Sequence, residues 1–357
     1  MPKTLQRLEE ELSLTEDKTE KAGILAQMTS LLAEHDHYKA IFCGSQALNL
    51  IRESDLPDIK VGVLNTLAES SRRAGEFTTA RKYARLAAFI VRDCDLPDQE
   101  AKALNTLGIC CWHLGDQNRA LESYLRALEI RQRQGLDKAV AGLLNNIGGI
   151  CMHLEDTELA LGYYHRALKL KREHCSPMSI SNTLNNIGVC YRRLGRYREA
   201  LESFGEALQI RQIREEHQQV ARCLANMGRV YMDMGNQSIA LGFCLRARVL
   251  LGSGDKRYDL DLAILTVNVG EIYMRRGQVD LALKHAVKGL DTAEKVGDLN
   301  CVMNAFELLA TIYDNLGYHG KASHYCSRAD NAREQLQCVE AGRKLKAAKG
   351  SGSETPK

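Results

Sequence analysis

The asparagines of this chain recur at a fixed spacing, and their side chains are the ones best suited to bind a ligand. One file lies two residues before a recurring small residue and consists of Asn146, Asn186, Asn226 and Asn268. A second file lies one residue earlier and consists of Asn65, Asn105, Asn145 and Asn185. Asparagine is a mediocre helix former, so its repeated use inside predicted helices indicates a compensating role. Its amide both donates and accepts hydrogen bonds, which suits holding the backbone of an extended peptide. The alternative is that these amides bridge neighbouring helices or bond local backbone.

Arginines form a second recurring group, near the ends of the same predicted helices. They occur in pairs, with two histidines at the matching phase: Arg72 and Arg73, His113, His153, Arg192 and Arg193, Arg275 and Arg276. Arg222 and Arg229 are seven residues apart and therefore share one face of a helix. This pattern predicts a positive surface in the middle of the chain that prefers an acidic segment of a partner. The alternative is a solvated rim.

Catalytic and metal-binding motifs are absent from the sequence. It contains no HExxH, no GxSxG and no phosphate-cradling GxxxxGK. His113 and His153 could share a metal ion, but no carboxylate stands in register with them. We therefore predict that the protein is not an enzyme and has no catalytic residue, no metal site and no cofactor.

The cysteines are predicted to be free thiols. There are 12 of them and no CxxC pair, which argues against a disulfide framework in so long a chain. Six are expected in the core, either on apolar sides of helices or in place of an aromatic residue: Cys110, Cys111, Cys151, Cys190, Cys244 and Cys326.

An internal repeat with a step of 40 residues positions all these side chains. Eight copies begin at Ile24, Leu64, Leu104, Leu144, Leu184, Leu224, Thr266 and Phe306. Seven copies carry glycine or alanine four residues after the start, and all eight carry alanine twelve residues beyond that position. Small residues at fixed offsets allow two helices to cross closely, because larger side chains would force the axes apart. The repeat therefore predicts eight helix pairs.

Proline and glycine mark the predicted helix ends. Pro57, Pro97 and Pro177 share one phase and separate successive helix pairs. Within pairs, glycines are expected to close the first helix in the left-handed conformation, at Gly75, Gly115, Gly195, Gly235, Gly277 and Gly317. Glu155 takes this place in one copy, at a cost of about 1 kcal/mol if its φ is positive. We expect an N-terminal capping helix in residues 1–20, eight repeats in 21–335, and a charged helix end with a disordered tail in 336–357.

The pattern L-x-x-[LI]-G-x-x-[CY] followed by A-x-x-x-[YF]-x-x-A resembles the tetratricopeptide repeat, in its longer, 40-residue class. The resemblance covers roughly residues 20–335. Within this class, the repeats resemble those of kinesin light chains, of the Leu-Gly-Asn adaptors of spindle orientation and of bacterial peptide-sensing regulators. The NNIG strings that begin at Asn145 and Asn185 are especially like the light-chain and adaptor repeats. The resemblance implies an all-α fold, a right-handed α-solenoid whose first helices line a concave groove for an extended peptide. In related repeats an asparagine ladder faces this groove.

Composition limits the kinds of partner. A formal net charge of +3 gives no global attraction to nucleic acid or to an acidic membrane surface. No run of 18 apolar residues occurs, and the polar, acidic start does not fit a secretion signal, so we expect a cytoplasmic protein without membrane insertion.

These observations predict a non-enzymatic adaptor or regulator that binds an extended peptide segment of a partner in the concave groove. The alternative is a structural scaffold subunit of a larger cytosolic or cytoskeletal assembly. The expected partner is a protein or peptide, with an acidic segment as the candidate ligand, and not nucleic acid or a small-molecule cofactor. The candidate peptide-binding residues are Asn105, Asn145, Asn146, Asn185, Asn186, Arg192, Arg193, Arg222, Asn226, Arg229 and Asn268.

Overall fold

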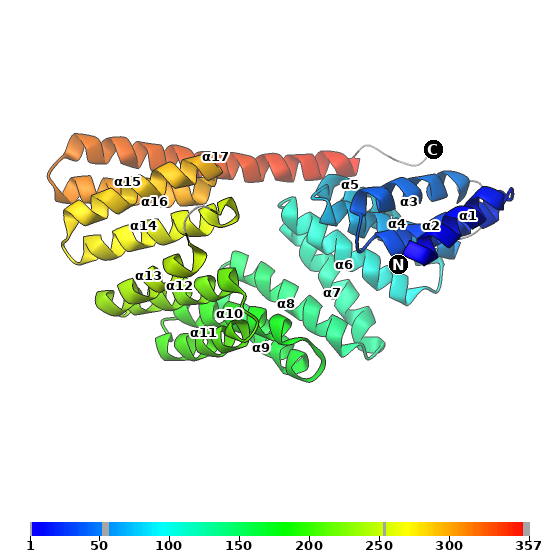
Figure 1. The fold of residues 1–357 in the computed structure, drawn as a ribbon, viewed down its shortest axis with the longest axis horizontal. Coiled ribbons are helices and arrows are strands. Elements are labelled where there is room, and N and C mark those ends of the chain that lie inside the picture. Colours follow the sequence, from blue (N-terminus) through cyan, green and yellow to red (C-terminus); the bar gives the residue numbers. More distant parts are fainter. Residues whose placement is uncertain (1, 52–56, 253–254, 353–357) are drawn as a thin grey trace. The chain divides into compact units, whose positions relative to one another are not determined.

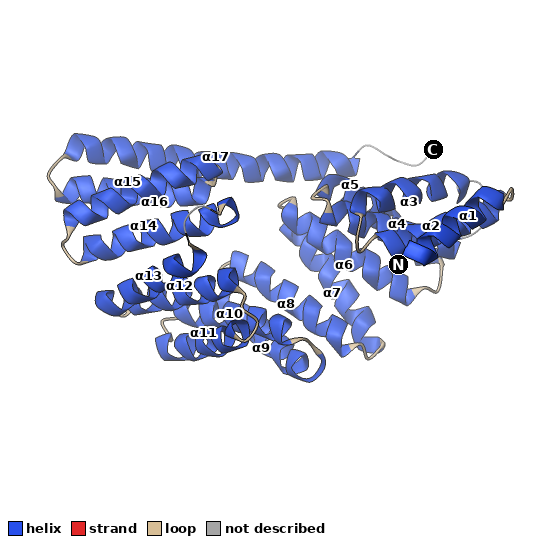
Figure 2. Cartoon of the chain, viewed as in Figure 1, coloured by secondary structure: helices blue, strands red, loops and turns tan. Residues whose placement is uncertain are grey.

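A computed structural model describes residues 2–51, 57–252 and 255–352. Within these ranges the chain is helical and contains no strand (Figure 2). The all-α repeat solenoid predicted from the sequence is thereby confirmed. None of the helices in these ranges combines the length and the apolar character needed to cross a membrane.

The helices follow the predicted pairing. Helix α1 (Pro2–Leu14) precedes the pairs, and its Leu8 is buried in one core cluster with Leu25 and Met28. The pairs are α2 (Lys18–Leu32) with α3 (His37–Ile51), α4 (Pro57–Arg73) with α5 (Phe77–Ile90), α6 (Pro97–His113) with α7 (Gln117–Arg133), α8 (Asp137–His153) with α9 (Thr157–His174), α10 (Pro177–Arg193) with α11 (Tyr197–Gln212), α12 (His217–Asp233) with α13 (Gln237–Leu251), α14 (Asp259–Arg275) with α15 (Val279–Val296), and α16 (Leu299–Asn315) with α17 (His319–Gly352). Two short 3-10 helices, Val91–Asp93 and Lys256–Tyr258, lie in linkers.

The chain divides into two compact units. Unit 1 contains residues 1–150 and 342–357, and unit 2 contains residues 151–341. In unit 1, α4 contacts both α2 and α6; in unit 2, the first helices α10, α12, α14 and α16 contact one another in succession. Figure 1 shows the successive helices α14, α15 and α16 side by side within unit 2. First helices therefore form a continuous layer in each unit, and this layer carries the predicted asparagines.

The helix ends lie where proline and glycine predict them. Helices α4, α6 and α10 begin at Pro57, Pro97 and Pro177. The six glycines between paired helices have φ between 72° and 81°, and Glu155 replaces glycine with φ of 64°. The structure adds Glu215, with φ of 55°, between α11 and α12. Helix α17 continues to Gly352, and the rest of the expected tail, residues 353–357, lies outside the described residues.

The small residues of the repeat permit close helix crossings. A Cβ atom built on Gly108 would lie 2.6 Å from the ring of Tyr124, and one on Gly188 would lie 2.7 Å from the ring of Phe204. Both rings are buried on the second helices α7 and α11. Glycine on the first helix thus makes room for an aromatic ring on the second, as the repeat pattern predicts.

The cysteines that the structure describes are free, and most of them are buried. Five of the six thiols assigned to the core from the sequence are buried there, but the prediction for Cys326 is wrong, since its side chain is exposed. The neighbouring Tyr325 supplies the ring that packs against α16: its ring lies 5.5 Å from that of Tyr313 and 6.1 Å from that of Phe306. One residue of rotation on a helix moves Cys326 to the outer face.

Three second helices carry a buried cation near their last turn, at positions that the sequence analysis did not single out: Arg131, Lys171 and Arg211. Arg211, 2% exposed, donates to Asn182 Oδ1 at 2.9 Å and to the carbonyl oxygen of Gln219 at 3.2 Å. Lys171 donates to Thr183 Oγ1 at 2.8 Å. These bonds join a second helix to neighbouring first helices, and the cations also lie at the end of a helix dipole that favours positive charge.

Candidate functional site

First helices α2, α4 and α6 of unit 1 line an open groove of about 880 Å³. This volume is within the range of ligand-binding clefts, roughly 300–1,000 Å³. Gly23 on α2 and Gly62 on α4 contribute to its wall, and a Cβ atom built on either would meet nothing within 4 Å. The groove is therefore open where a larger side chain would narrow it.

Amide side chains line the middle of this groove. Asn65 donates from Nδ2 to the carbonyl oxygen of Gln99 at 3.0 Å and to Gln99 Oε1 at 2.9 Å. Its own Oδ1 is buried and accepts no hydrogen bond. Asn105, half-buried on α6, lines the same groove. Of the candidate residues from the sequence, Asn105 is the one that this groove contains.

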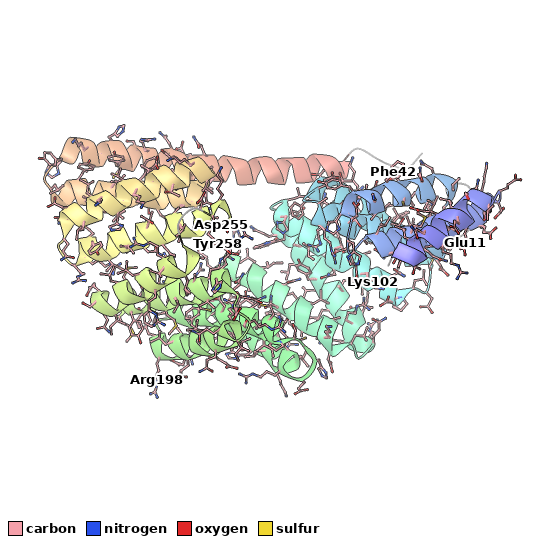
Figure 3. All side chains as sticks on the ribbon, in the orientation of Figure 1. Glu11, Phe42, Lys102, Arg198, Asp255 and Tyr258 are labelled. Atoms are coloured by element: carbon pink, nitrogen blue, oxygen red, sulfur yellow. The ribbon has the colours of Figure 1, made fainter. Side chains whose placement is uncertain are left out.

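One carboxylate and two guanidinium groups lie at one end of α4. Glu69 accepts from Arg72 Nη2 at 2.6 Å and from Arg73 Nε at 2.8 Å. Burial by itself raises the pKa of Glu69, but the hydrogen bonds from the two arginines outweigh burial, so its pKa lies below the ordinary value. Two cations against one anion leave this cluster with a positive charge. Lys102, on α6 (Figure 3), also lines the groove and pairs with Asp98 at 2.7 Å.

The groove of unit 1 identifies the register positions that face it. On α4 the small residue of the repeat is Ala68, and the groove-facing positions include Asn65, three residues before it, Thr66, two residues before it, and Glu69, one residue after it. The same offsets fall on Asn185 and Asn186 of α10, on Asn226 and Arg229 of α12, and on Asn268 of α14. Residues at equal offsets in stacked repeats point the same way. The candidate residues of unit 2 therefore occupy positions equivalent to groove-lining positions of unit 1.

The asparagines differ in what they bond. Asn226 Nδ2 donates to Asn185 Oδ1 at 2.9 Å, so these two amides bridge neighbouring repeats, as the alternative interpretation of the sequence expects. Asn186 is half-buried and makes no side-chain hydrogen bond within the described part of the chain. Asn268 is 6% exposed, and its Nδ2 is buried without a partner. Asn145 and Asn146 are half-buried on α8.

Most candidate arginines of unit 2 are already bonded. Arg192 pairs with Asp233 at 2.9 Å, and Arg222 pairs with Asp261 at 2.9 Å. Arg193 is exposed and donates to the carbonyl oxygen of Met152 at 3.3 Å. Carboxylates from the next repeat thus neutralise much of the positive surface predicted from the sequence.

Sequence reasoning missed Glu69, Gln99 and Lys102, which line the groove of unit 1. A signal for Glu69 was present, because it lies three and four residues before Arg72 and Arg73, the spacing of helical ion pairs. Gln99 had no such signal, because its partner Asn65 is 34 residues away.

No group of three or more potential metal-ligating side chains occurs among the residues described. His113, considered above as a metal ligand, stacks on Phe77 with ring centroids 4.0 Å apart.

Comparison with known proteins identifies the repeat. Models of the tetratricopeptide repeat match residues 61–133, 143–176 and 179–248. No curated protein sequence matches the chain.

Solved structures share the fold at low identity. The apo form of RapI superposes with a TM-score of 0.67 at 16% identity, over 78% of this chain and 99% of that chain. NprR in complex with its cognate peptide NprX gives 0.60 at 18% identity, over 88% and 89%. Aspartyl phosphate phosphatase F from Bacillus subtilis gives 0.57 at 14% identity, over 90% and 95%. At these identities the likeness concerns the fold.

Proposed function

The chain is a tetratricopeptide-repeat protein, and we propose that it acts as a non-enzymatic adaptor or regulator that binds an extended peptide segment of a partner protein along its first helices. The observation that carries this proposal is the groove of unit 1, with its open glycine wall and its amide lining. An extended peptide needs main-chain hydrogen bonds along its length and space for alternate side chains. Asn105, which is half-buried and lines the groove, is suited to the first need, and the space beside Gly62 is suited to the second.

The peptide complex of NprR supports this choice of ligand class, since that protein has the same fold and its structure contains its cognate peptide. The phosphatase among the similar structures favours an enzyme instead. Against that reading, the sequence carries none of the catalytic motifs considered above. Function belongs to a site rather than to a fold, and the site here is lined by amides and paired charges.

A second candidate function is a scaffold subunit that is covered by partners on its outer side. It is favoured by large apolar side chains on second helices, such as Phe42 on α3 and Phe89 on α5, which are 64% and 59% exposed. Phe42 is labelled in Figure 3. Exposed aromatic side chains of this size are typical of protein contacts.

Blocking the groove with a bulky residue tests the proposal. In Gly62→Trp the indole enters open space, so the helical fold should persist while the groove is filled. Gly162→Trp is the matched control, because Gly162 is exposed on the second helix α9 and also has nothing near its Cβ atom. Peptides selected from a displayed random library on the wild-type chain would be measured on both variants by fluorescence anisotropy.

We expect Gly62→Trp to abolish binding of the peptides selected at this groove and Gly162→Trp to leave it unchanged. Equal binding by wild type and Gly62→Trp, with intact circular dichroism, would contradict the groove proposal. Loss of partner binding in a Phe42→Ser, Phe89→Ser double variant would then support the scaffold function.

A further inference from the structure

Two second helices of unit 1, α3 and α5, expose large apolar side chains on their outer faces. On α3, Tyr38 and Phe42 are 70% and 64% exposed and lie four residues apart, on one side of the helix. On α5, Leu86 and Phe89 are 45% and 59% exposed and lie three residues apart. A single exposed apolar residue is common, but four on two neighbouring helices indicate a contact surface.

The two helices are joined through the core beneath these side chains. Leu48 of α3 and Tyr83 of α5 both pack against the same two core clusters of unit 1. Figure 1 shows α3 and α5 next to each other in this unit. Because their inner faces share a core, their exposed faces form one continuous surface.

Lysine and arginine supply every formal charge within these two helices. Neither α3 nor α5 contains an aspartate or a glutamate, whereas the next second helix, α7, contains Glu122 and Glu129. Three cations are exposed on α3 and α5, namely Lys39, Lys82 and Arg85. The formal net charge of +3 is an average over the whole chain and does not show this local excess.

Carboxylates of this chain compensate little of that charge. The Lys82 ammonium forms no ion pair or hydrogen bond with any residue that the structure describes. Lys39 pairs with Asp36, which precedes α3, at 3.8 Å, and its side chain is 73% exposed. A surface pair with this geometry contributes little, so Lys39 still attracts anions from outside.

Shape and charge together favour an acidic lipid surface as the occupant. The four apolar side chains project from the helices, and none of them lines the groove of unit 1. A protein partner would have to supply a matching hollow for each side chain and carboxylates between the hollows. A bilayer interface yields to projecting side chains, and aromatic residues beside lysine and arginine are the composition that it favours. A second copy of this chain is disfavoured, because a symmetric contact would bring the same cations together.

We propose that this surface docks peripherally on an acidic membrane. We call it the α3–α5 face, and it consists of Tyr38, Lys39, Phe42, Lys82, Arg85, Leu86 and Phe89. The apolar side chains enter the headgroup region, and the cations attract the anionic lipids around them. No helix crosses the bilayer in this arrangement. The residues of the α3–α5 face are distinct from those that line the groove, so the inference goes beyond the proposed peptide binding.

Sedimentation with vesicles tests the charge of the α3–α5 face. Sucrose-loaded vesicles contain phosphatidylcholine alone or phosphatidylcholine with about one third phosphatidylserine. The test variant is Lys39→Glu with Lys82→Glu. The control is Lys169→Glu with Arg198→Glu, which changes the net charge equally at exposed positions of second helices α9 and α11. Arg198 is labelled in Figure 3.

We expect wild type to bind the vesicles that contain phosphatidylserine, to bind neutral vesicles far less, and to lose binding as salt is added. Lys39→Glu with Lys82→Glu should weaken binding by at least about tenfold, because each cation near the surface contributes to the attraction. The charge control should bind nearly as wild type does.

A second pair of variants tests the apolar side chains. Phe42→Ser with Phe89→Ser should weaken binding roughly tenfold, because two apolar side chains no longer enter the interface. The control is Ile213→Ser with Val249→Ser in unit 2, where the side chains are 84% and 78% exposed, and it should leave binding unchanged.

Fluorescence reports entry into the bilayer directly. In Phe42→Trp the new indole should be quenched by brominated phosphatidylcholine in acidic vesicles. Wild type provides the background, because its single tryptophan is Trp112 on the first helix α6. This measurement and the comparison of acidic with neutral vesicles on wild type do not depend on whether a double variant folds.

Three results would overturn the inference. Wild type that does not bind acidic vesicles would exclude the membrane and leave the α3–α5 face to a protein partner. Equal loss in the charge variant and its control would assign binding to the net charge of the chain. Binding that is insensitive to the Phe42 and Phe89 changes, without quenching in Phe42→Trp, would show adsorption without docking of this face. Gly62→Trp should bind vesicles as wild type does, so failure of the peptide groove and failure of the membrane surface are distinguishable.

Discussion

Adding one methyl group to Gly188 should cost stability, although the same change elsewhere in the chain should increase it. In Gly188→Ala the new Cβ lies 2.7 Å from Cε1 and 2.8 Å from Cζ of Phe204. Phe204 is fully buried, so its ring cannot move away without displacing its neighbours. Overpacking of this kind typically costs about 1–3 kcal/mol. Replacing glycine by alanine inside a helix returns about 0.5–1 kcal/mol.

A matched variant isolates the steric cost. Gly205 lies inside the helix α11, and a Cβ there would meet nothing within 4 Å, so Gly205→Ala should gain the helical contribution alone. Subtracting the two variants cancels that contribution, and Gly188→Ala should be less stable than Gly205→Ala by about 1–3 kcal/mol. A Phe204→Leu change added to Gly188→Ala should recover part of the loss, as expected for residues in direct contact.

Equilibrium urea unfolding followed by circular dichroism measures these differences. Because contacts in a repeat protein are mainly between neighbours, hydrogen exchange in α10 and α11 should report the same order locally. If Gly188→Ala and Gly205→Ala have the same free energy of unfolding, the close approach of α10 to Phe204 does not constrain position 188. The steric argument for the small residues of the repeat would then fail.

Three further predictions concern single side chains. Glu155→Gly should raise the free energy of unfolding by up to about 1 kcal/mol, because the φ of 64° at this position is costly for a residue with a Cβ atom. Thermal or urea unfolding measures the change, and a destabilised variant would contradict the strain assigned to Glu155. The pKa of Glu69 is lower in the folded state than in the unfolded state, so its ion pairs stabilise the fold above the unfolded pKa, and this stabilisation is lost as the pH falls through the folded pKa. Glu69→Gln should therefore reduce the free energy of unfolding at neutral pH and flatten the acid side of its pH dependence. An unchanged pH–stability curve would refute the ion-pair assignment. Under native conditions the exposed thiol of Cys326 should react with a maleimide, whereas that of Cys190 should not, because burial raises the pKa of Cys190 to about 12. Mass spectrometry of the labelled peptides measures the order of reaction, and the opposite order would contradict the burial of Cys190.

The sequence alone was sufficient for the features that depend on neighbours along the chain. The phase of the repeat predicted the boundaries between helix pairs at Pro57, Pro97 and Pro177, and it placed Glu155 where glycine otherwise closes the first helix with left-handed φ. These features depend on proline geometry and on the cost of positive φ, which act within a few residues. Repetition strengthened each prediction, because one interpretation had to hold in every copy.

The tertiary structure decided which of the equivalent polar residues are satisfied. Asn226 and Asn186 share one position in their repeats, yet Asn226 donates to Asn185 and Asn186 bonds nothing among the described residues. Arg222 and Arg229 share one helix face, yet Arg222 has Asp261 as a partner. The repeat pattern predicts where these side chains lie but not what they meet.

The sequence does not predict these partners because the two residues of each ion pair or side-chain hydrogen bond lie far apart along the chain. Asp261 lies 39 residues beyond Arg222, and Asn185 lies 41 residues before Asn226. Such partners are brought together when one repeat stacks on the next. Side-chain length and burial then decide which acceptor lies within hydrogen-bond distance of each donor. The sequence therefore determined the solenoid and its polar files, whereas stacking of the repeats decided that Arg222 pairs with Asp261 and that Arg229, on the same helix, bonds no residue that the structure describes.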